Sequence, residues 1–200
     1  MAGRLRLIAG GRLWLGLCAL LALAATLGWV LPADALDWQP TLALSQPWRW
    51  WTAALVHFSP MHLVANLAGL GVVAALGRAA AVPVDLSLAW LASWPLTHLG
   101  LLAVPELAHY GGLSGLLHGA VASVGAWLVV AESGARRRIG GAVCLGLAIK
   151  LAVERPWGPA VQPQAGWDIA VAPAAHLSGA LWSLGCTLAL MALRRVAGRR

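Results

Sequence analysis

The amino-acid sequence predicts an all-α membrane protein with six transmembrane helices. Of its 200 residues, 60% are hydrophobic and only 10% are charged, which exceeds the apolar share of ordinary soluble domains. The apolar residues also gather into runs that are long enough, or nearly so, to cross the hydrocarbon core of a bilayer as helices. Since these runs follow one another along the whole chain, we expect residues 1–200 to form a single integral-membrane domain.

The six predicted spans are residues 13–31, 51–77, 84–104, 111–131, 139–153 and 170–193. The fifth is the weakest, because it is short and contains Lys150, whose amine can snorkel toward the membrane surface. Prolines and glycines mark the connections, above all the first and the fifth.

The first span has a competing interpretation as a cleaved signal peptide. Basic residues precede it, and Ala33-Asp34-Ala35 resembles a cleavage site. The apolar stretch from Leu13 to Leu31 is longer than the usual signal-peptide core, which favours a retained helix.

Arginine placement predicts the orientation of the bundle. With six spans, eleven arginines fall on one side of the membrane, and the positive-inside rule makes that side cytoplasmic. They are Arg4, Arg6, Arg12, Arg78, Arg136, Arg137, Arg138, Arg194, Arg195, Arg199 and Arg200. Five of the seven acids fall on the other side: Asp34, Asp37, Glu106, Glu154 and Asp168. Both termini are therefore expected in the cytoplasm, and this agreement is the main reason to keep the weak fifth span.

The same composition argues against other partners. A net charge of +7 is compatible with nucleic-acid binding, but the arginines lie at the ends of apolar runs and form no basic amphipathic face, so no nucleic acid is expected. The three cysteines, Cys18, Cys144 and Cys186, are an odd number within apolar runs. They predict neither a disulfide framework nor a metal site, and no cofactor is expected.

Two short segments carry a serine and a histidine at matching depth. Gly112-Leu113-Ser114-Gly115 begins the fourth span, and Ala175-His176-Leu177-Ser178-Gly179 lies near the start of the sixth. Both spans enter the membrane from the non-cytoplasmic side, so Ser114 and His176 are predicted near the N-termini of two parallel helices. Polar side chains at bilayer depth are costly and usually mark a working site, and a serine nucleophile needs a base within hydrogen-bond reach.

Small residues in these segments allow close approach. Gly112 lets the backbone come near a substrate, while Gly115-xxx-Gly119 and Gly179-xxx-Ser183 are patterns that let two helices touch.

The second span offers hydrogen-bond donors for an oxyanion. His62 and Asn66 are four residues apart and share one helix face near the same surface, with His57 just before them. The alternative is that His57 and Asn66 are polar contacts between helices without a catalytic role.

The ordered set resembles the rhomboid family of intramembrane serine proteases. The set is Trp48-Arg49, then His57, His62 and Asn66, then Gly112-Leu113-Ser114-Gly115, then Ala175-His176 with Gly179, and the resemblance covers roughly residues 45–185. It implies a six-transmembrane-helix rhomboid-like bundle with Ser114 as nucleophile, His176 as general base, and His62, Asn66 and the Ser114 backbone N–H as the oxyanion hole. Trp48-Arg49 would belong to a membrane-associated first loop.

Two positions depart from the usual rhomboid pattern. His118 stands where many rhomboids have an aromatic residue, and Ser183 stands where a second glycine is common. The segment from Gly112 to Gly119 and the small size resemble the rhombosortase subgroup, which is associated with proteins carrying a C-terminal glycine-rich motif, an apolar helix and a basic end. This implies membrane-anchored exported proteins as substrates, a location in the bacterial inner membrane, and an active site that opens to the periplasmic side.

Several side chains have competing roles. His118 lies one turn beyond Ser114 and is an alternative base, although a histidine on a neighbouring helix is better aimed, so His118 is expected to support His176. Asp168 is expected to be a solvated acid rather than a triad member, and His98 and His109 receive no role. A general rhomboid protease with other single-span substrates, a noncatalytic rhomboid-like binding protein and a transporter remain the alternative functions.

Overall fold

The computed structural model describes residues 2–197, with side chains described from Gly10 onward. Its long helices are α1 (Ala2–Gly28), α4 (Pro60–Ala80), α5 (Val84–Leu99), α6 (Ser114–Ala131), α7 (Gly134–Glu154) and α8 (Pro173–Ala197). Its short helices are α2 (Ala33–Leu36), η1 (Pro40–Leu42), α3 (Arg49–Thr52), η2 (Ala53–Leu55) and η3 (Gly100–Ala103). Over residues 2–197 the extended pairing is limited to isolated bridges, which join Trp38 to Tyr110 and Gln162 to Val171.

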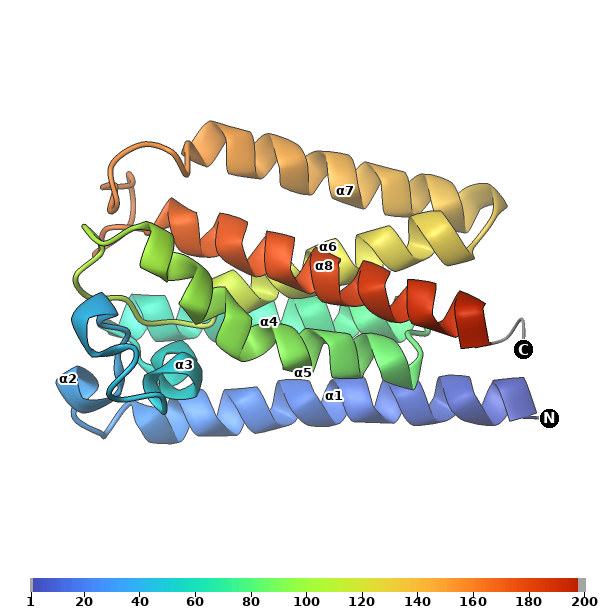
Figure 1. Ribbon diagram of the computed structural model, residues 1–200, viewed down its shortest axis with the longest axis horizontal. Helices are drawn as coiled ribbons and strands as arrows, with labels where there is room; N and C mark the ends of the chain where they lie inside the picture. Colours follow the sequence, from blue (N-terminus) through green and yellow to red (C-terminus); the bar gives the residue numbers. More distant parts are fainter. Residues whose placement is uncertain (1, 198–200) are drawn as a thin grey trace.

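The long helices run side by side along one axis (Figure 1). Both ends of the chain lie at one end of the bundle, and the irregular segments with α2 and α3 lie at the other (Figure 1). We call the latter the loop end. Helix α7 lies along the outside of the bundle and contacts mainly α6, whereas α6 and α8 pack closely against each other.

The predicted fold class, an all-α helical membrane bundle, is confirmed. Five helices, α1, α4, α5 together with η3, α6 and α8, are long and apolar enough to cross a membrane. Helix α7 is as long as α4, but it carries Lys150 and three consecutive arginines, which make it less apolar. Its crossing of the membrane therefore stays a prediction.

Two predicted helix boundaries were wrong. The second span was expected from residue 51, but α4 begins at Pro60, after the two short turns α3 and η2. Ser59 sets this start, because its hydroxyl accepts a hydrogen bond from the His62 N–H at 3.1 Å and Pro60 needs no partner as the first helical residue. The fifth helix begins at Gly134 rather than residue 139, so its arginines are helical.

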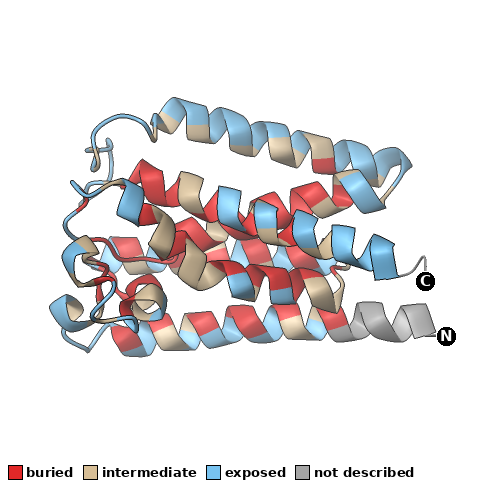
Figure 2. Ribbon diagram, in the orientation of Figure 1, coloured by how far each residue is buried: buried red, intermediate tan, exposed pale blue. Residues whose placement is uncertain are grey.

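Helix α6 lies at the centre of the bundle (Figure 2). Ten of the 18 residues of α6 are buried, compared with six of 21 in α4 and eight of 25 in α8. Two indole groups join neighbouring helices. Trp90 of α5 donates to the Leu116 carbonyl of α6 at 3.0 Å, and Trp14 of α1 donates to the Val73 carbonyl of α4 at 3.0 Å. The helix that begins with Ser114 is thus held on several sides, which suits a position where geometry matters.

The arrangement of the ends is the one expected from the arginines. The C-terminal end of α4, which carries Arg78, and the turn between α6 and α7 lie at the same end of the bundle as the start of α1 and the end of α8 (Figure 1). Arg199 and Arg200 lie outside the described residues. The assignment of this end to the cytoplasm stays a prediction.

Candidate active site

A cavity of about 430 Å³ opens at the loop end of the bundle. Residues from α4, α6, α7 and α8 line it, together with the segment that connects α7 to α8. The predicted site residues that face it are Ser114, His176, His62, Asn66 and His118. Polar side chains that are far apart in the sequence thus meet in one largely apolar cavity near the end of the helices.

A tight turn places Ser114 at the first position of α6. Gly112 has φ +122°, a conformation that L side chains rarely adopt. The buried Tyr110 hydroxyl spans this turn, since it donates to the Gly112 carbonyl at 3.2 Å and accepts from the Gly115 N–H at 3.4 Å. The same hydroxyl lies 3.4 Å from Ser114 Oγ. Burial raises the pKa of Tyr110 above its usual range, so its phenol keeps the proton that these contacts use.

Gly112 also keeps the space in front of His62 and Asn66 open. A Cβ atom at position 112 would lie 2.6 Å from His62 Nε2 and 3.4 Å from Asn66 Nδ2. The Phe58 N–H donates to His62 Nδ1 at 3.5 Å, and this long bond favours the tautomer with the proton on Nε2. His62 and Asn66 therefore present N–H groups toward the turn that carries Ser114.

His176 lies in the first turn of α8 and is only 5% exposed. Its Nδ1 atom lies 2.8 Å from Glu154 Oε2, at the C-terminal end of α7. Its ring stacks on that of His118, with centroids 4.1 Å apart and planes 11° from parallel. Position and orientation of the imidazole are thus set from two directions.

Ser114 and His176 face the same cavity without a direct bond. Among the described residues, no hydrogen bond joins Ser114 Oγ to the His176 ring, and Ser114 Oγ pairs with the Tyr110 hydroxyl instead. Catalytic hydrogen bonds are often long in enzymes without substrate and shorten when substrate binds, so both residues stay candidates.

The small residues of the two segments meet where α6 crosses α8. A Cβ atom at Gly115 would lie 2.9 Å from the Ala175 carbonyl, and one at Gly119 would lie 2.8 Å from the Gly179 carbonyl. A Cβ at Gly179 would collide with the Gly115 backbone. The backbones can touch only because these side chains are absent, and this contact brings the start of α6 beside the start of α8.

Comparison with known families decides the assignment of the chain. The family model of the rhomboid domain matches residues 44–195, which is most of the sequence. The chain belongs to the rhomboid family. Rhomboids are intramembrane serine proteases, so the family points to hydrolase chemistry on membrane proteins. A comparison with curated proteins gave no match.

In this rhomboid, His57 supports the wall of the cavity rather than lining it. Its Nδ1 atom pairs with the Leu55 carbonyl at 3.2 Å, and its ring lies 4.8 Å from that of His62. Burial lowers the pKa of His57, so its ring is neutral and Nδ1 is the donor. Its contact with the edge of the site is compatible with both predicted roles, catalytic support and polar packing.

Three polar residues for which no role in the site was predicted have hydrogen-bond or ion-pair partners in the structure. Asp168 was expected to be a solvated acid, and it is exposed, but its carboxylate also accepts a hydrogen bond from the Ser59 hydroxyl at 2.7 Å. Buried His98 pairs with the Trp50 carbonyl at 2.6 Å, and His109 pairs with Asp37 at 2.7 Å. The contacts of Asp168 and His109 join loop segments, and that of His98 joins α5 to α3, which is a structural role in each case.

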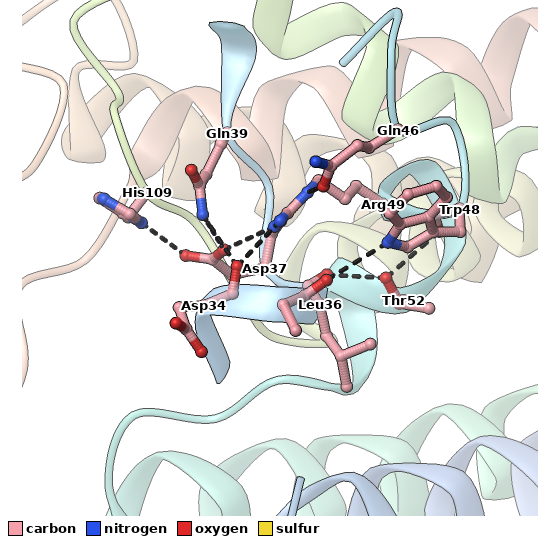
Figure 3. Close-up of polar contacts among 10 residues, drawn as sticks. Asp34, Leu36, Asp37, Gln39, Gln46, Trp48, Arg49, Thr52 and His109 are labelled. Carbon is pink, nitrogen blue, oxygen red and sulfur yellow. Dashed lines mark hydrogen bonds and ion pairs between the residues drawn. The ribbon is translucent and has the colours of Figure 1, made fainter. Parts of the chain in front are cut away.

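The first loop is organised around a buried ion pair (Figure 3). Arg49 Nη1 lies 3.0 Å from Asp37 Oδ1, and both side chains are almost completely buried. The Arg49 guanidinium also donates to the carbonyls of Asp34 and Asp37. Trp48 remains half exposed and donates to the Ala35 carbonyl at 3.3 Å. Arg49 therefore fixes the loop, while neighbouring tryptophans face outward.

Sequence reasoning missed two residues of this rhomboid site, Glu154 and Tyr110. From the sequence, Glu154 is only one of the acids predicted on the non-cytoplasmic side. Its place at the end of the fifth span, at the same depth as His176, was the one indication that the two side chains could meet. Tyr110 precedes the Gly112 turn by two residues, but no spacing rule links a tyrosine to a serine four residues later when a turn intervenes.

Proposed function

We propose that this rhomboid is an intramembrane serine endopeptidase in which Ser114 is the nucleophile and His176 the general base. The observation that carries the proposal is the shared cavity at the loop end of the bundle, which Ser114, His176, His62 and Asn66 all line. A transporter needs no such combination of a serine, a base and paired N–H donors.

The proposed reaction begins with attack of Ser114 Oγ on the carbonyl carbon of the scissile peptide bond. His176 accepts the hydroxyl proton at Nε2, because Glu154 occupies Nδ1. Negative charge then develops on the substrate oxygen, and His62, Asn66 and the Ser114 N–H are placed to donate to it. Such donors typically contribute about 3 kcal/mol each to the rate when they are preorganised. His176 gives its proton to the leaving amine, and water then hydrolyses the acyl-enzyme.

The position of the cavity limits which peptide bonds are within reach. The cavity opens at the loop end, so the scissile bond should lie at the outer end of the substrate's own transmembrane helix. A helical backbone hides its carbonyls in hydrogen bonds that are costly to break in lipid. Each glycine weakens a helix by about 1 kcal/mol relative to alanine, so a glycine-rich segment unwinds more easily into the site.

We propose exported proteins with a C-terminal anchor helix as the substrate class, with cleavage just before that helix. This assignment rests on the resemblance of the segment from Gly112 to Gly119 to rhombosortases. It is compatible with the unwinding argument, since their tails begin with a glycine-rich motif. The enzyme would then act in the bacterial inner membrane, on the periplasmic side.

Labelling with a fluorophosphonate tests the enzyme class. We expect Ser114 to be acylated in the full-length protein, and Ser114→Ala to abolish both labelling and proteolysis while insertion into the membrane is unchanged. Normal turnover by Ser114→Ala would disprove the serine-protease mechanism.

Co-expression with a tail-anchored reporter tests the substrate class. Mass spectrometry of the released C-terminus should place the cut at the small-residue motif, and replacing that motif with leucines should reduce release. Undiminished release would count against the unwinding argument, and a cut on the cytoplasmic side would rule out the proposed orientation.

A further inference from the structure

Rhomboid chemistry is described by two residues, a serine and a histidine, but here a carboxylate lies directly behind the histidine. Glu154 Oε2 is 2.8 Å from His176 Nδ1. We propose that Glu154 is the positioning residue of a Ser114–His176–Glu154 triad. This inference rests on the proposed function, because it concerns the same site.

The contact fixes which nitrogen of His176 is the base. In a neutral imidazole one nitrogen carries a proton and the other a lone pair. The carboxylate accepts the proton on Nδ1, and the lone pair is then on Nε2, the atom that must receive the Ser114 proton. When Nε2 becomes protonated, the carboxylate stabilises the imidazolium. Glu154 thus acts through His176 and need not touch the substrate.

The surroundings strengthen this interaction. The side chain of His176 is 7% exposed and that of Glu154 is 15% exposed, so water screens the pair only weakly. A second charge holds the carboxylate in place, since Lys150, one turn earlier on α7, pairs with the other oxygen of Glu154. One oxygen is bound to the lysine, and the other is left for His176.

The stacked His118 ring completes the restraint. It covers one face of the His176 imidazole, while Glu154 binds its Nδ1 edge. The Nδ1 atom of His118 pairs with the Ser114 carbonyl at 2.7 Å. Through its stack on His176, His118 therefore also fixes the position of the base relative to the helix that carries the nucleophile. Asp168, the other acid on this side of the site, accepts from the Ser59 hydroxyl and has no contact with His176 among the described residues.

The same three side chains, His118, Glu154 and His176, have ligand atoms within 4.8 Å of one another, as in some metal sites. Two features oppose that assignment. The histidine rings lie nearly parallel, so their lone pairs do not converge on one point, and the Lys150 ammonium, bound to one Glu154 oxygen, would repel a cation. The geometry points to a base and its orienting acid.

The test compares Glu154→Gln, Glu154→Asp and the matched control Glu132→Gln in the full-length protein with a tail-anchored substrate. Glu132→Gln makes the same change from a carboxylate to an amide, but Glu132 lies at the opposite end of the bundle and pairs with Arg136. We expect Glu154→Gln to reduce kcat by about 100-fold or more with KM within about 2-fold, because only transition-state stabilisation is lost. Glu154→Asp keeps the charge and should recover at least about 10-fold of that loss. Glu132→Gln should match the wild type.

The rate of Ser114 acylation by a fluorophosphonate separates the possible failures. If the fluorophosphonate acylates Ser114 at the same rate in the wild type and in Glu154→Gln, the triad is wrong and the protease proposal stands. A loss in Glu154→Gln that Glu154→Asp does not recover, or a matching rise in KM, would mean that Glu154 only anchors α7, and would overturn the triad as well. Loss of activity on addition of a metal chelator would favour the metal site instead. Absence of both cleavage and acylation in the wild type would overturn the proposed function itself.

Discussion

The imidazole rings of His118 and His176 lie face to face, 4.1 Å apart between centroids and 11° from parallel. His118 is one turn beyond Ser114 on α6, and His176 is in the first turn of α8. The stack therefore joins the helix of the proposed nucleophile to the helix of the proposed base. This stacking is what we expect if His118 takes the packing place that an aromatic residue has in many rhomboids.

The stack predicts different effects for two substitutions of His118. His118→Phe keeps a flat ring against His176 and should retain most of the proteolytic activity. His118→Ala leaves one face of the base uncovered and should lower kcat by about 2- to 10-fold, since an aromatic pair contributes about 0.5–1.5 kcal/mol beyond its buried area. Initial rates of reporter cleavage measure both effects.

His176→Ala is the reference for this comparison and should be as inactive as Ser114→Ala. If His176→Ala were active while both His118 variants were inactive, His118 would be the base and our assignment would be wrong.

The conformation and surroundings of Gly112 predict that even a methyl side chain at this position lowers activity. In Gly112→Ala the new methyl group would meet His62 Nε2, and the residue would have to keep φ near +122° or change the turn. We expect acylation of Ser114 to fall by about 100-fold or more, because the oxyanion donors are displaced. The rate of fluorophosphonate labelling measures this fall.

Gly71→Ala is the control for the Gly112 experiment. Gly71 lies on α4, like His62, and a Cβ there meets nothing within 4 Å, so labelling should be unchanged. Equal labelling of wild type and Gly112→Ala would show that the space in front of His62 is not needed.

Much of the fold and part of the site could be predicted from local sequence. Apolar runs predict spanning helices because most of them are long enough to cross the hydrocarbon core as a helix. Ser114 and His176 could be picked out because each is a polar residue near the start of such a run, and His62 and Asn66 because they share one helix face; their order also resembles a family. Glu154 could not be paired with His176, since that contact depends on how the irregular segment from residue 155 to residue 172 returns the chain to α8.

The first loop shows why the remaining parts escaped prediction. Asp37 and Arg49 are twelve residues apart, and nothing periodic links them. Their pairing depends on the bridge between Trp38 and Tyr110, which ties this loop to the segment just before Ser114. Contacts between irregular segments follow no repeat, so only a three-dimensional structure reveals them.

The crossing of α6 and α8 predicts a strong effect of one methyl group. Gly179→Ala places a Cβ against the Gly115 backbone, and the helices must separate to relieve the clash. We expect a loss of about 1–3 kcal/mol in stability, as for other overpacked contacts, together with lower activity. Thermal unfolding in detergent measures the first effect.

Gly185→Ala on the same helix is the matched control. A Cβ at Gly185 meets nothing within 4 Å, and alanine favours the helix, so stability should be equal or higher. If both variants behaved alike, close contact at Gly179 would not matter to the bundle.

The buried pair in the first loop predicts a large loss of stability for Asp37→Asn. This change leaves the Arg49 charge buried without its counter-charge, which costs about 3 kcal/mol or more. Glu132→Gln removes a partly exposed ion pair with Arg136, 3.1 Å long, and should cost less than about 1 kcal/mol. Melting temperatures of the two variants that fell by the same amount would contradict the importance of burial.

The final prediction concerns the orientation of the bundle. Ala165 lies in the irregular segment before α8 and Ala135 in the first turn of α7, and both are exposed residues at opposite ends of the molecule. In a variant whose three native cysteines are replaced by alanine, we introduce Ala165→Cys or Ala135→Cys and treat intact cells with a membrane-impermeant maleimide. The positive-inside rule predicts that the arginine-rich Ala135 end is cytoplasmic, so only the cysteine at 165 should be labelled from outside. Labelling at 135 but not at 165 would invert the topology and place the cavity on the cytoplasmic side, where it would be out of reach of exported substrates.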